Sequence, residues 1–357
     1  MRRAAALIVG GGPAGSAAAI RLAKGGVRPL LIERSEGPRD VVCGGFLGWD
    51  ALAALRRLGI DPQALGAQPI SRLRLISRHR QVETALPHPA AGLSRRTLDE
   101  ALLSTVQAAG VEVLRGRTVR AAEGSMLRLD DGEEMQGEAL LLATGKHELR
   151  GLERDADIAS ASVGLRTSLS GPNLKRSLAG VIELHLFDGG YGGLLVQDDG
   201  SVNLCLSVSR SRLKAAGGVE QLVGELRWEL PSLRERLEQG EAGEWSAVAG
   251  VPYGWRAKAT APGVYRVGDQ AAVIASLAGD GIAIALESGM AAAEALLSGA
   301  SAPTYQSAFA RQSAVPVRLA EALRKSAERP LPRAMLMGLV RAVPGAARLA
   351  ARLTRVG

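Results

Sequence analysis

The sequence predicts an α/β fold in which a parallel sheet, covered by helices, carries an inserted antiparallel β-sheet domain. A strand, a glycine turn and a helix open the chain over residues 7–24, and about 250 residues later a second buried strand ends on Gly268 and Asp269. Between them, short stretches of alternating apolar and polar residues are separated by glycine turns. The first two features are typical of parallel strands whose ends bind a ligand, and the third is typical of antiparallel strands.

The opening turn has the spacing GxGxxG, with glycines that permit a tight turn, a close approach to a pyrophosphate and close packing of strand on helix. The helix that follows directs free N–H groups and its positive dipole end toward the phosphates. A glycine turn alone also serves simple packing, but the strand and the helix around it favour a Rossmann-like dinucleotide site. The predicted phosphate-binding residues are Gly10, Gly12, Pro13, Ala14 and Gly15.

A second apolar strand over residues 27–32 ends at Glu33. An acid roughly 20 residues after such glycines accepts hydrogen bonds from the adenosine ribose. An acid at this position favours an unphosphorylated ribose, as in FAD or NAD. Arg34, the basic neighbour, is included in the predicted cofactor site.

Composition restricts the class of protein. The 357 residues suffice for one large or two intermediate domains, and 46% apolar with 22% charged residues is ordinary for a soluble protein. Two cysteines form no disulfide framework, and glycines interrupt the apolar start, so we expect no export signal and a cytoplasmic location. Aromatic residues are only 3%, which argues against nucleic-acid binding, and the four histidines lack metal-ligand spacing.

The net charge of +8 belongs to the end of the chain. Residues 311–357 hold ten Lys or Arg and two Asp or Glu, so the first 310 residues are balanced. This basic segment mixes arginines with leucines and methionines. Such a segment either contacts the inner face of a membrane or packs on the domain with its arginines in solvent. The sequence leaves both open and does not indicate an oligomeric state.

The chain between the two ligand-binding stretches alternates helices and strands. We expect a helix at 49–58, a hairpin at 73–84 closed by Pro87 and Pro89, and a helix capped by Ser94 that extends to 109. A buried parallel strand at 139–143 then ends at Gly145, where small residues let the backbone approach the cofactor.

The region 151–260 is rich in strands, expected at 181–187, 194–197 and 202–208, and includes a helical pair over 213–237. Cys205 is expected in the core of the third strand, and Trp228 is expected to pack. We divide the chain into three parts. A discontinuous cofactor domain comprises residues 1–70, 91–150 and 261–310, and a substrate domain comprises residues 71–90 and 151–260. A basic helical segment comprises residues 311–357.

The stretch from Gly268 to Leu297 is the second candidate ligand site. Asp269 at a strand end suits a sugar-alcohol hydroxyl, and Gly281 begins a helix whose N–H groups can face an anion. A plain crossover with a glycine turn is the alternative. Cys43 precedes two glycines; it is either a small buried hydrophobe or a neighbour of the cofactor, and the residues alone do not choose.

Together these motifs resemble the geranylgeranyl reductase family, within the flavoproteins that share the p-hydroxybenzoate hydroxylase fold. The resemblance covers roughly half the chain and implies FAD as the cofactor. It places Gly10, Gly12, Gly15 and Glu33 at the adenosine diphosphate. It further implies that Arg95 lies near the cofactor and that Asp269 binds the ribityl and pyrophosphate region. It also implies that Gly281 and Ile282 contact the flavin pyrimidine, and that Cys43 and Gly44 lie near the flavin ring and the substrate.

The sequence also departs from its relatives. Hydroxylases of this fold usually carry Asp-Gly where this chain has Thr144 and Gly145, and Ser276 replaces the usual proline before the second glycine cluster. The tryptophan-rich motif of flavin halogenases is absent, which argues against halogenation.

The expected function is that of an FAD-dependent oxidoreductase, first as a reductase of a carbon–carbon double bond in an apolar, isoprenoid- or polyketide-like small molecule. The alternatives are a monooxygenase that hydroxylates an aromatic or electron-rich small molecule, and a non-catalytic FAD- or dinucleotide-binding protein. The candidate proton donors are Cys43, Tyr191 and Tyr253. Only one GxGxxG is present, so NAD(P)H or another electron donor is expected to dock transiently.

Overall fold

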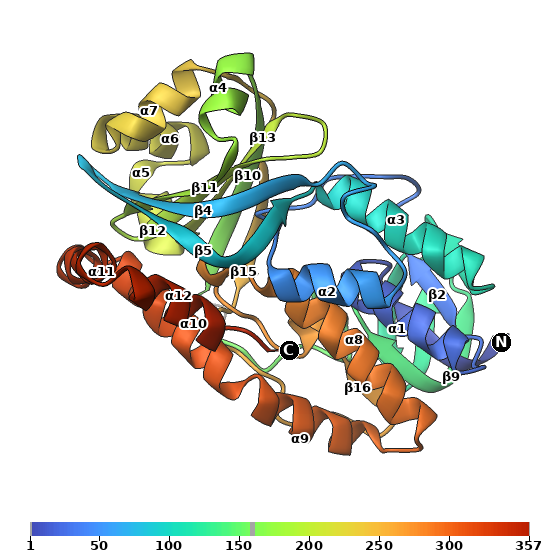
Figure 1. The fold of residues 1–357 in the computed structure, drawn as a ribbon. Helices are drawn as coiled ribbons and strands as arrows, with labels where there is room; N and C mark the ends of the chain where they lie inside the picture. Colours follow the sequence, from blue (N-terminus) through green and yellow to red (C-terminus); the bar gives the residue numbers. More distant parts are fainter. Residues whose placement is uncertain (1, 158–160, 357) are drawn as a thin grey trace.

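The computed structural model describes residues 2–157 and 161–356 and contains two sheets, seen together in Figure 1. The first has seven strands in the order β6-β2-β1-β9-β8-β7, with β16 paired to β9. The strands that form its parallel core are β6 (Glu112–Arg115), β2 (Leu30–Glu33), β1 (Arg2–Val9), β9 (Glu134–Leu142) and β16 (Val264–Arg266). An antiparallel hairpin completes it through β7 (Val119–Glu123) and β8 (Met126–Leu129).

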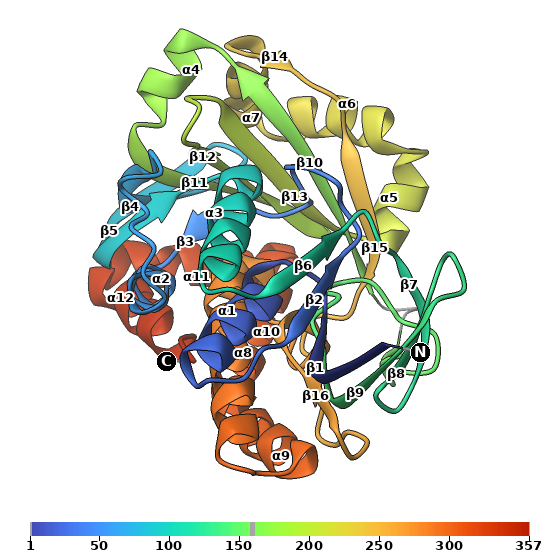
Figure 2. The same ribbon diagram turned by 90° about the vertical axis from the view of Figure 1, so that its right-hand side faces the viewer.

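Strand β1 is a continuous apolar run because both of its faces are covered. Ile8 packs into the cluster formed with helices α1 (Pro13–Lys24), α3 (Arg95–Ala108) and α8 (Gly281–Leu297). Leu7 points to the other face, where it meets residues of the β7–β8 hairpin. Figure 2 shows these helices on one side of the sheet and the hairpin at its margin. The predicted parallel strands, the opening helix and the helix capped by Ser94 are confirmed.

The second sheet has nine strands in the order β14-β10-β13-β12-β11-β4-β5-β3, with β15 paired to β10. It is antiparallel, as predicted, except that β11 runs parallel to β4. Its strands are β3 (Phe46–Leu47), β4 (Gln68–Ser77), β5 (Arg80–Gly92), β10 (Ser162–Ser170), β11 (Gly180–Phe187), β12 (Gly190–Val196), β13 (Val202–Ser209), β14 (Glu241–Ala242) and β15 (Ser246–Val251).

The prediction that Pro87 and Pro89 close the hairpin is wrong, because both prolines lie inside β5. The register between β4 and β5 shifts between Ile70 and Arg72, so residues 86–89 form a bulge. On its other side, β5 pairs with β3 only at Ala91 and Gly92. The prolines therefore lie in a bulge and at an open sheet edge, where their missing N–H groups cost no hydrogen bond between strands.

The middle helices cover one face of the second sheet and number three where a pair was predicted: α5 (Arg210–Ala216), α6 (Val219–Glu229) and α7 (Pro231–Glu238). Gly217 ends α5 in a left-handed conformation, and Pro231 starts a new helix after α6. Trp228 on α6 is 83% exposed, so the expectation that it packs is wrong.

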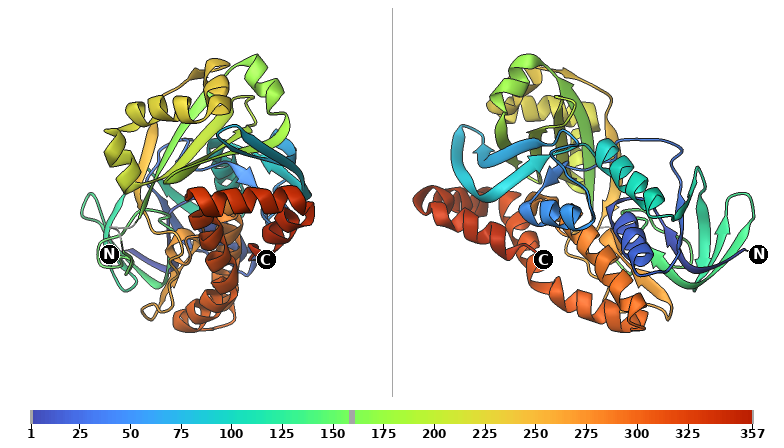
Figure 3. Two further views of the ribbon diagram at one scale, coloured as in Figure 1. Left: turned by 90° about the vertical axis from the view of Figure 1, so that its left-hand side faces the viewer. Right: turned by 45° about the vertical axis from the view of Figure 1, so that its right-hand side comes forward.

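The remaining helices frame the molecule. Figure 3 shows the C-terminal helices running along one side of it, away from the N-terminus. The C-terminal helices are α9 (Ala302–Gln312), α10 (Ala314–Ala327), α11 (Pro330–Ala342) and α12 (Pro344–Leu353), and the other remaining helices are α2 (Trp49–Arg57) and α4 (Pro172–Ser177).

A buried ion cluster holds the second sheet to its helices. The Glu183 carboxylate of β11 is fully buried and contacts Arg74 of β4 at 2.8 Å, Arg236 of α7 at 3.1 Å and His185 at 2.8 Å. Burial by itself would raise the pKa of Glu183, but hydrogen bonds from His185, Arg236 and Arg74 lower it to about 2. Glu183 is therefore more readily ionised in the folded protein than in the unfolded chain.

We expect Glu183→Gln to lower the free energy of unfolding by about 3–5 kcal/mol near neutral pH, because two arginines lose their buried partner. The folded-state pKa is lowered, so the wild-type advantage is full above the unfolded pKa of about 4.3 and shrinks as pH falls toward 2, by up to about 3 kcal/mol. Urea unfolding of both proteins from about pH 6 to pH 3 measures this. The half-exposed control Glu83→Gln should cost about 1 kcal/mol or less; a pH-independent Glu183→Gln effect would contradict the assignment.

Candidate active site

One cavity of about 940 Å³ connects the two sheets. Of the residues predicted from sequence, only Gly15 does not line it; it lies beneath the glycine turn. The lining residues among those predictions are Gly10, Gly12, Pro13, Ala14, Glu33, Arg34, Cys43, Gly44, Arg95, Gly145, Tyr191, Tyr253, Gly268, Asp269, Gly281 and Ile282. The structure therefore gathers residues from the whole chain around one space.

The glycine turn is shaped for a close backbone approach. A Cβ on Gly15 would lie 1.9 Å from the Gly10 carbonyl oxygen, and a Cβ on Gly10 would lie 2.4 Å from that of Ala143. Gly10 also has a φ of +107°, which L side chains rarely adopt. Helix α1 then starts at Pro13 with no side chain capping its first turn, so its N–H groups are available to an anion.

Glu33 stands at the end of β2, facing the turn. Its carboxylate accepts hydrogen bonds from the N–H groups of Gly11 at 2.7 Å and Ser35 at 2.8 Å, and each oxygen keeps a lone pair for a ligand hydroxyl. The Arg34 guanidinium lies 2.7 Å from the His147 ring nitrogen. Burial and then the nearby Arg34 lower the pKa of His147, so a neutral imidazole accepts this bond.

Arg95 reaches from α3 toward the glycine turn and lies within 3.4 Å of where a Gly12 Cβ would be. Its guanidinium donates two hydrogen bonds of 2.8 Å to Asp99. Burial disfavours the charge, but the Asp99 carboxylate overcomes this and raises the pKa of Arg95. A permanent positive charge therefore stands beside the predicted phosphate site.

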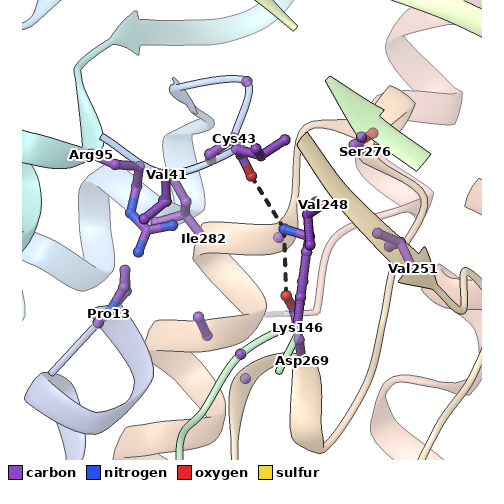
Figure 4. A pocket seen from close by; sticks show the side chains of 18 of the residues that line it. Pro13, Val41, Cys43, Arg95, Lys146, Val248, Val251, Asp269, Ser276 and Ile282 are labelled. Atoms are coloured by element: carbon purple, nitrogen blue, oxygen red, sulfur yellow. Dashed lines mark hydrogen bonds and ion pairs between the residues drawn. The ribbon is translucent and has the colours of Figure 1, made fainter. Parts of the chain in front are cut away.

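Lys146 lies in the site but was not predicted from the sequence. It follows Gly145 at the end of β9, and its ammonium lies 3.6 Å from the Asp269 carboxylate and 3.5 Å from the Val42 carbonyl oxygen. Figure 4 shows its side chain between Cys43 and Asp269. Burial would lower the pKa of Lys146, but the charge of Asp269, followed by Cys43 and Tyr253, raises it. Its position after a cofactor-facing strand end was the available signal.

Two further side chains tie the ends of β9 and β16 together. Arg154 donates to the carbonyl oxygens of Asp269 at 3.1 Å and Lys146 at 2.9 Å. Gln270 donates to the carbonyl oxygens of Gly145 and His147, each at 3.0 Å. The strand ends that carry Lys146 and Asp269 are thus fixed relative to each other. Neither Arg154 nor Gln270 has a sequence motif that indicates this role.

The Cys43 loop is held by the second sheet. The amide of Asn203 on β13 donates to the carbonyl oxygens of Cys43 at 3.0 Å and Gly44 at 2.9 Å. Cys205 lies on the same strand, but it lines the cavity, so its predicted place in the strand core is wrong. Burial raises the pKa of the Cys205 thiol to about 12.

Tyr191 and Tyr253 meet at Ser276, although they come from β12 and from the loop after β15. The Tyr191 hydroxyl lies 2.6 Å from the Ser276 hydroxyl, and the Tyr253 hydroxyl lies 2.9 Å from it. Tyr191 also accepts a hydrogen bond from the Leu277 N–H at 3.0 Å. Burial raises the pKa of Tyr191 well above its usual value. The serine that replaces the expected proline thus completes a chain of three hydroxyls.

The start of α8 is fastened to the C-terminus of the chain. Arg355 forms ion pairs with Asp280, which precedes α8, and with Asp50 at 3.4 Å. Its guanidinium lies 4.1 Å from the centre of the Trp49 ring. No side chain caps the first turn of α8, so the N–H groups of Gly281 and Ile282 are available to a ligand.

These features fit FAD. Two uncapped helix starts face one cavity, a glycine turn leaves no room for side chains, and an acid and an arginine stand beside it. The remaining space extends beyond the strand ends to the second sheet.

Comparisons with known proteins agree with this geometry. The FAD binding domain family matches residues 3–150. The menaquinone reductase of Mycolicibacterium smegmatis is 30% identical over 83% of this chain and 77% of its own length. The chloroplastic geranylgeranyl diphosphate reductase of rice is 37% identical over 33% of this chain and 26% of its own. Among solved structures, the flavin-dependent brominase Bmp2 superposes with a TM-score of 0.81 at 17% identity, covering 99% of this chain and 93% of its own, which establishes a shared fold only.

We expect Gly15→Ala to yield protein without flavin absorbance, because the new methyl group pushes the glycine turn away from α1. The matched change Gly224→Ala, in α6 with open space around it, should leave the bound flavin unchanged. Visible spectra of the purified variants, with circular dichroism as the check on folding, measure both. Full flavin content in folded Gly15→Ala would show that this close contact is not required.

Proposed function

Because the chain belongs to the geranylgeranyl reductase family of FAD-dependent oxidoreductases, whose relatives include menaquinone reductase, we propose that it reduces a carbon–carbon double bond of an apolar substrate with an isoprenoid- or polyketide-like chain. FAD, when bound and reduced, supplies the hydride. The relatives' names supply the substrate class, since menaquinone and geranylgeranyl diphosphate both carry isoprenoid chains.

The observation that carries this proposal is the apolar half of the cavity. Beyond Cys43, its walls are built almost entirely from aliphatic side chains of the second sheet, of the loop before α8 and of the C-terminal helices. A long hydrocarbon chain gains from burial there at roughly 25 cal/mol per Å². The aliphatic lining comprises Leu73, Leu75, Leu86, Ile182, Leu184, Leu186, Leu206, Val248, Val251, Leu277, Leu323, Leu336 and Val340.

The few polar groups at the inner end of this space suit the proton that double-bond reduction also needs. Tyr191, Ser276 and Tyr253 form a connected hydroxyl chain, and Tyr191 stays protonated because it is buried. Tyr253 is only half-buried, so it can exchange protons with water. Cys43 offers a thiol on the cofactor side of the same cavity. The apolar walls exclude water from the reacting carbons.

The electron donor that reduces the flavin is a transiently bound molecule in this proposal. The chain has a single dinucleotide-binding turn, at Gly10 to Gly15, and the same cavity must serve the substrate. We therefore infer that NAD(P)H or another carrier docks transiently. Lys146 and Arg95 stay protonated beside the predicted site, and each offers a hydrogen-bond donor to an oxygen of the cofactor.

Anaerobic titration tests the function directly. We expect the bound flavin, once reduced with dithionite, to be reoxidised under argon by an added geranylgeranyl compound or by menaquinol, whose ring is already reduced, and mass spectrometry to show a product heavier by two hydrogen atoms in the isoprenoid chain. A product heavier by one oxygen atom, formed only in air, would instead identify a monooxygenase. A flavin that reacts with neither substrate would favour a binding protein.

The role of Cys43 is tested against the second thiol of the cavity. If Cys43 supplies the proton, Cys43→Ser should lower anaerobic turnover by roughly 100-fold, as is typical for loss of a general acid, with flavin content unchanged. Cys205→Ser, a change of the same chemistry on β13, should retain turnover. Unchanged turnover and product in Cys43→Ser would move the role to the Tyr191 hydroxyl chain, for which Tyr191→Phe is the corresponding variant.

A further inference from the structure

The C-terminal helices expose an unusual amount of apolar surface. Eight large apolar side chains are exposed in the described part of the chain, and six of them lie between residues 331 and 353. Exposed apolar groups that cluster in this way mark a surface for a partner or a membrane. The six are Leu331, Met335, Leu339, Val343, Leu349 and Leu353.

Their spacing produces a continuous outer stripe. Leu331, Met335 and Leu339 recur every fourth residue along α11, and Leu349 and Leu353 do so along α12. Residues four apart lie on one face of a helix, so each helix presents an apolar ridge to solvent. The two ridges adjoin because α11 packs on α12 at the end of the molecule seen in Figures 1 and 3.

The charged residues of α11 and α12 themselves have one sign. From residue 329 to the end, the chain contains six arginines and no Asp or Glu. Two of the six are used internally, since Arg333 pairs with Asp188 and Arg355 pairs with Asp280. Arg341, Arg348 and Arg352 are exposed among the apolar residues. Helices whose own charged residues are all cations, set beside exposed apolar side chains, are complementary to an anionic lipid surface.

The inner faces of the same two helices line the cavity. Leu336 and Val340 of α11, together with Ala347, Ala350 and Ala351 of α12, belong to its wall. One thin helical layer therefore separates the exposed apolar ridges from the apolar chamber that leads to Cys43. A protein partner or a second copy of the chain explains the outer ridges, but it gives no reason for this cavity wall behind them.

We propose that α11 and α12 form a docking surface for anionic lipid bilayers, and that a substrate dissolved in the bilayer enters the cavity between these helices. The docking surface stands on the exposed residues alone, whereas the entry route rests on the proposed function. No single described helix is long and apolar enough to cross a membrane; α11 and α12 together have the length and composition, but the chain bends by 114° between them. A bent pair lying in the membrane surface suits both ridges.

Vesicle flotation of the full-length FAD-bound protein tests the surface. We expect the protein to float with phosphatidylcholine vesicles that contain phosphatidylglycerol, less with pure phosphatidylcholine, and less at high salt. The combined variant Leu331→Glu, Met335→Glu and Leu339→Glu should remain at the bottom. Its control, Trp228→Glu, alters the exposed tryptophan of α6 and should float like the wild type. Equal loss in both, or no flotation of the wild type, overturns the proposal.

The charge contribution is tested separately. Changing Arg341, Arg348 and Arg352 together to Gln should weaken binding to the anionic vesicles on the order of 100-fold. The matched control changes Arg3, Arg128 and Arg150, exposed arginines elsewhere on the chain, to Gln and should have little effect. If both triple variants weaken binding equally, attraction is a property of total charge, and the specific surface is refuted.

Two measurements separate this proposal from its alternatives. Light scattering that shows a dimer in the wild type and a monomer in the triple Glu variant, without vesicle binding, identifies a contact between copies and overturns the lipid surface. Turnover of detergent-dispersed substrate should be equal in wild type and triple Glu variant, while turnover of vesicle-borne substrate should fall in the variant. Vesicle binding without turnover in either format leaves the docking surface intact and refutes the proposed function.

Discussion

The site depends on the close approach of two helices that begin at its rim. A Cβ on Gly289 of α8 would lie 2.2 Å from the Ala14 carbonyl oxygen of α1, and Gly15 meets Gly10 in the same way. Only at these separations do the two helix starts face one space. Because protein interiors are close-packed, a single methyl group at either contact displaces a whole helix. The cofactor cradle is therefore a consequence of packing as much as of chemical groups.

Paired charges maintain the cradle. Arg95 with Asp99 and Lys146 with Asp269 place cations where an anionic cofactor binds, and each cation is stabilised by its own carboxylate. Arg154 then joins the strand ends through backbone carbonyl oxygens. A buried charge without a partner would shift its pKa and neutralise itself, so these carboxylates keep Arg95 and Lys146 charged at physiological pH.

The C-terminal segment is part of the site. Its last helices close the apolar chamber, and Arg355 fixes the end of the chain to Asp280 at the start of α8. A boundary at residue 311 thus divides residues that share one cavity. Since the same helices carry the exposed ridges, the surface and the chamber are two faces of one layer.

The sequence by itself determined a dinucleotide site, the parallel core and the order of most elements, because GxGxxG, Glu33 and the strand ending at Asp269 are local patterns, and the family resemblance implied FAD. It did not reveal Lys146, Asn203 or Ser276, whose roles arise only when β9, β13 and the loop before α8 meet. It also misplaced Cys205 and Trp228, since burial is decided by what covers a strand or helix. Local spacing specifies backbone shape, but contacts between distant segments are fixed by packing, and only the tertiary structure decided those.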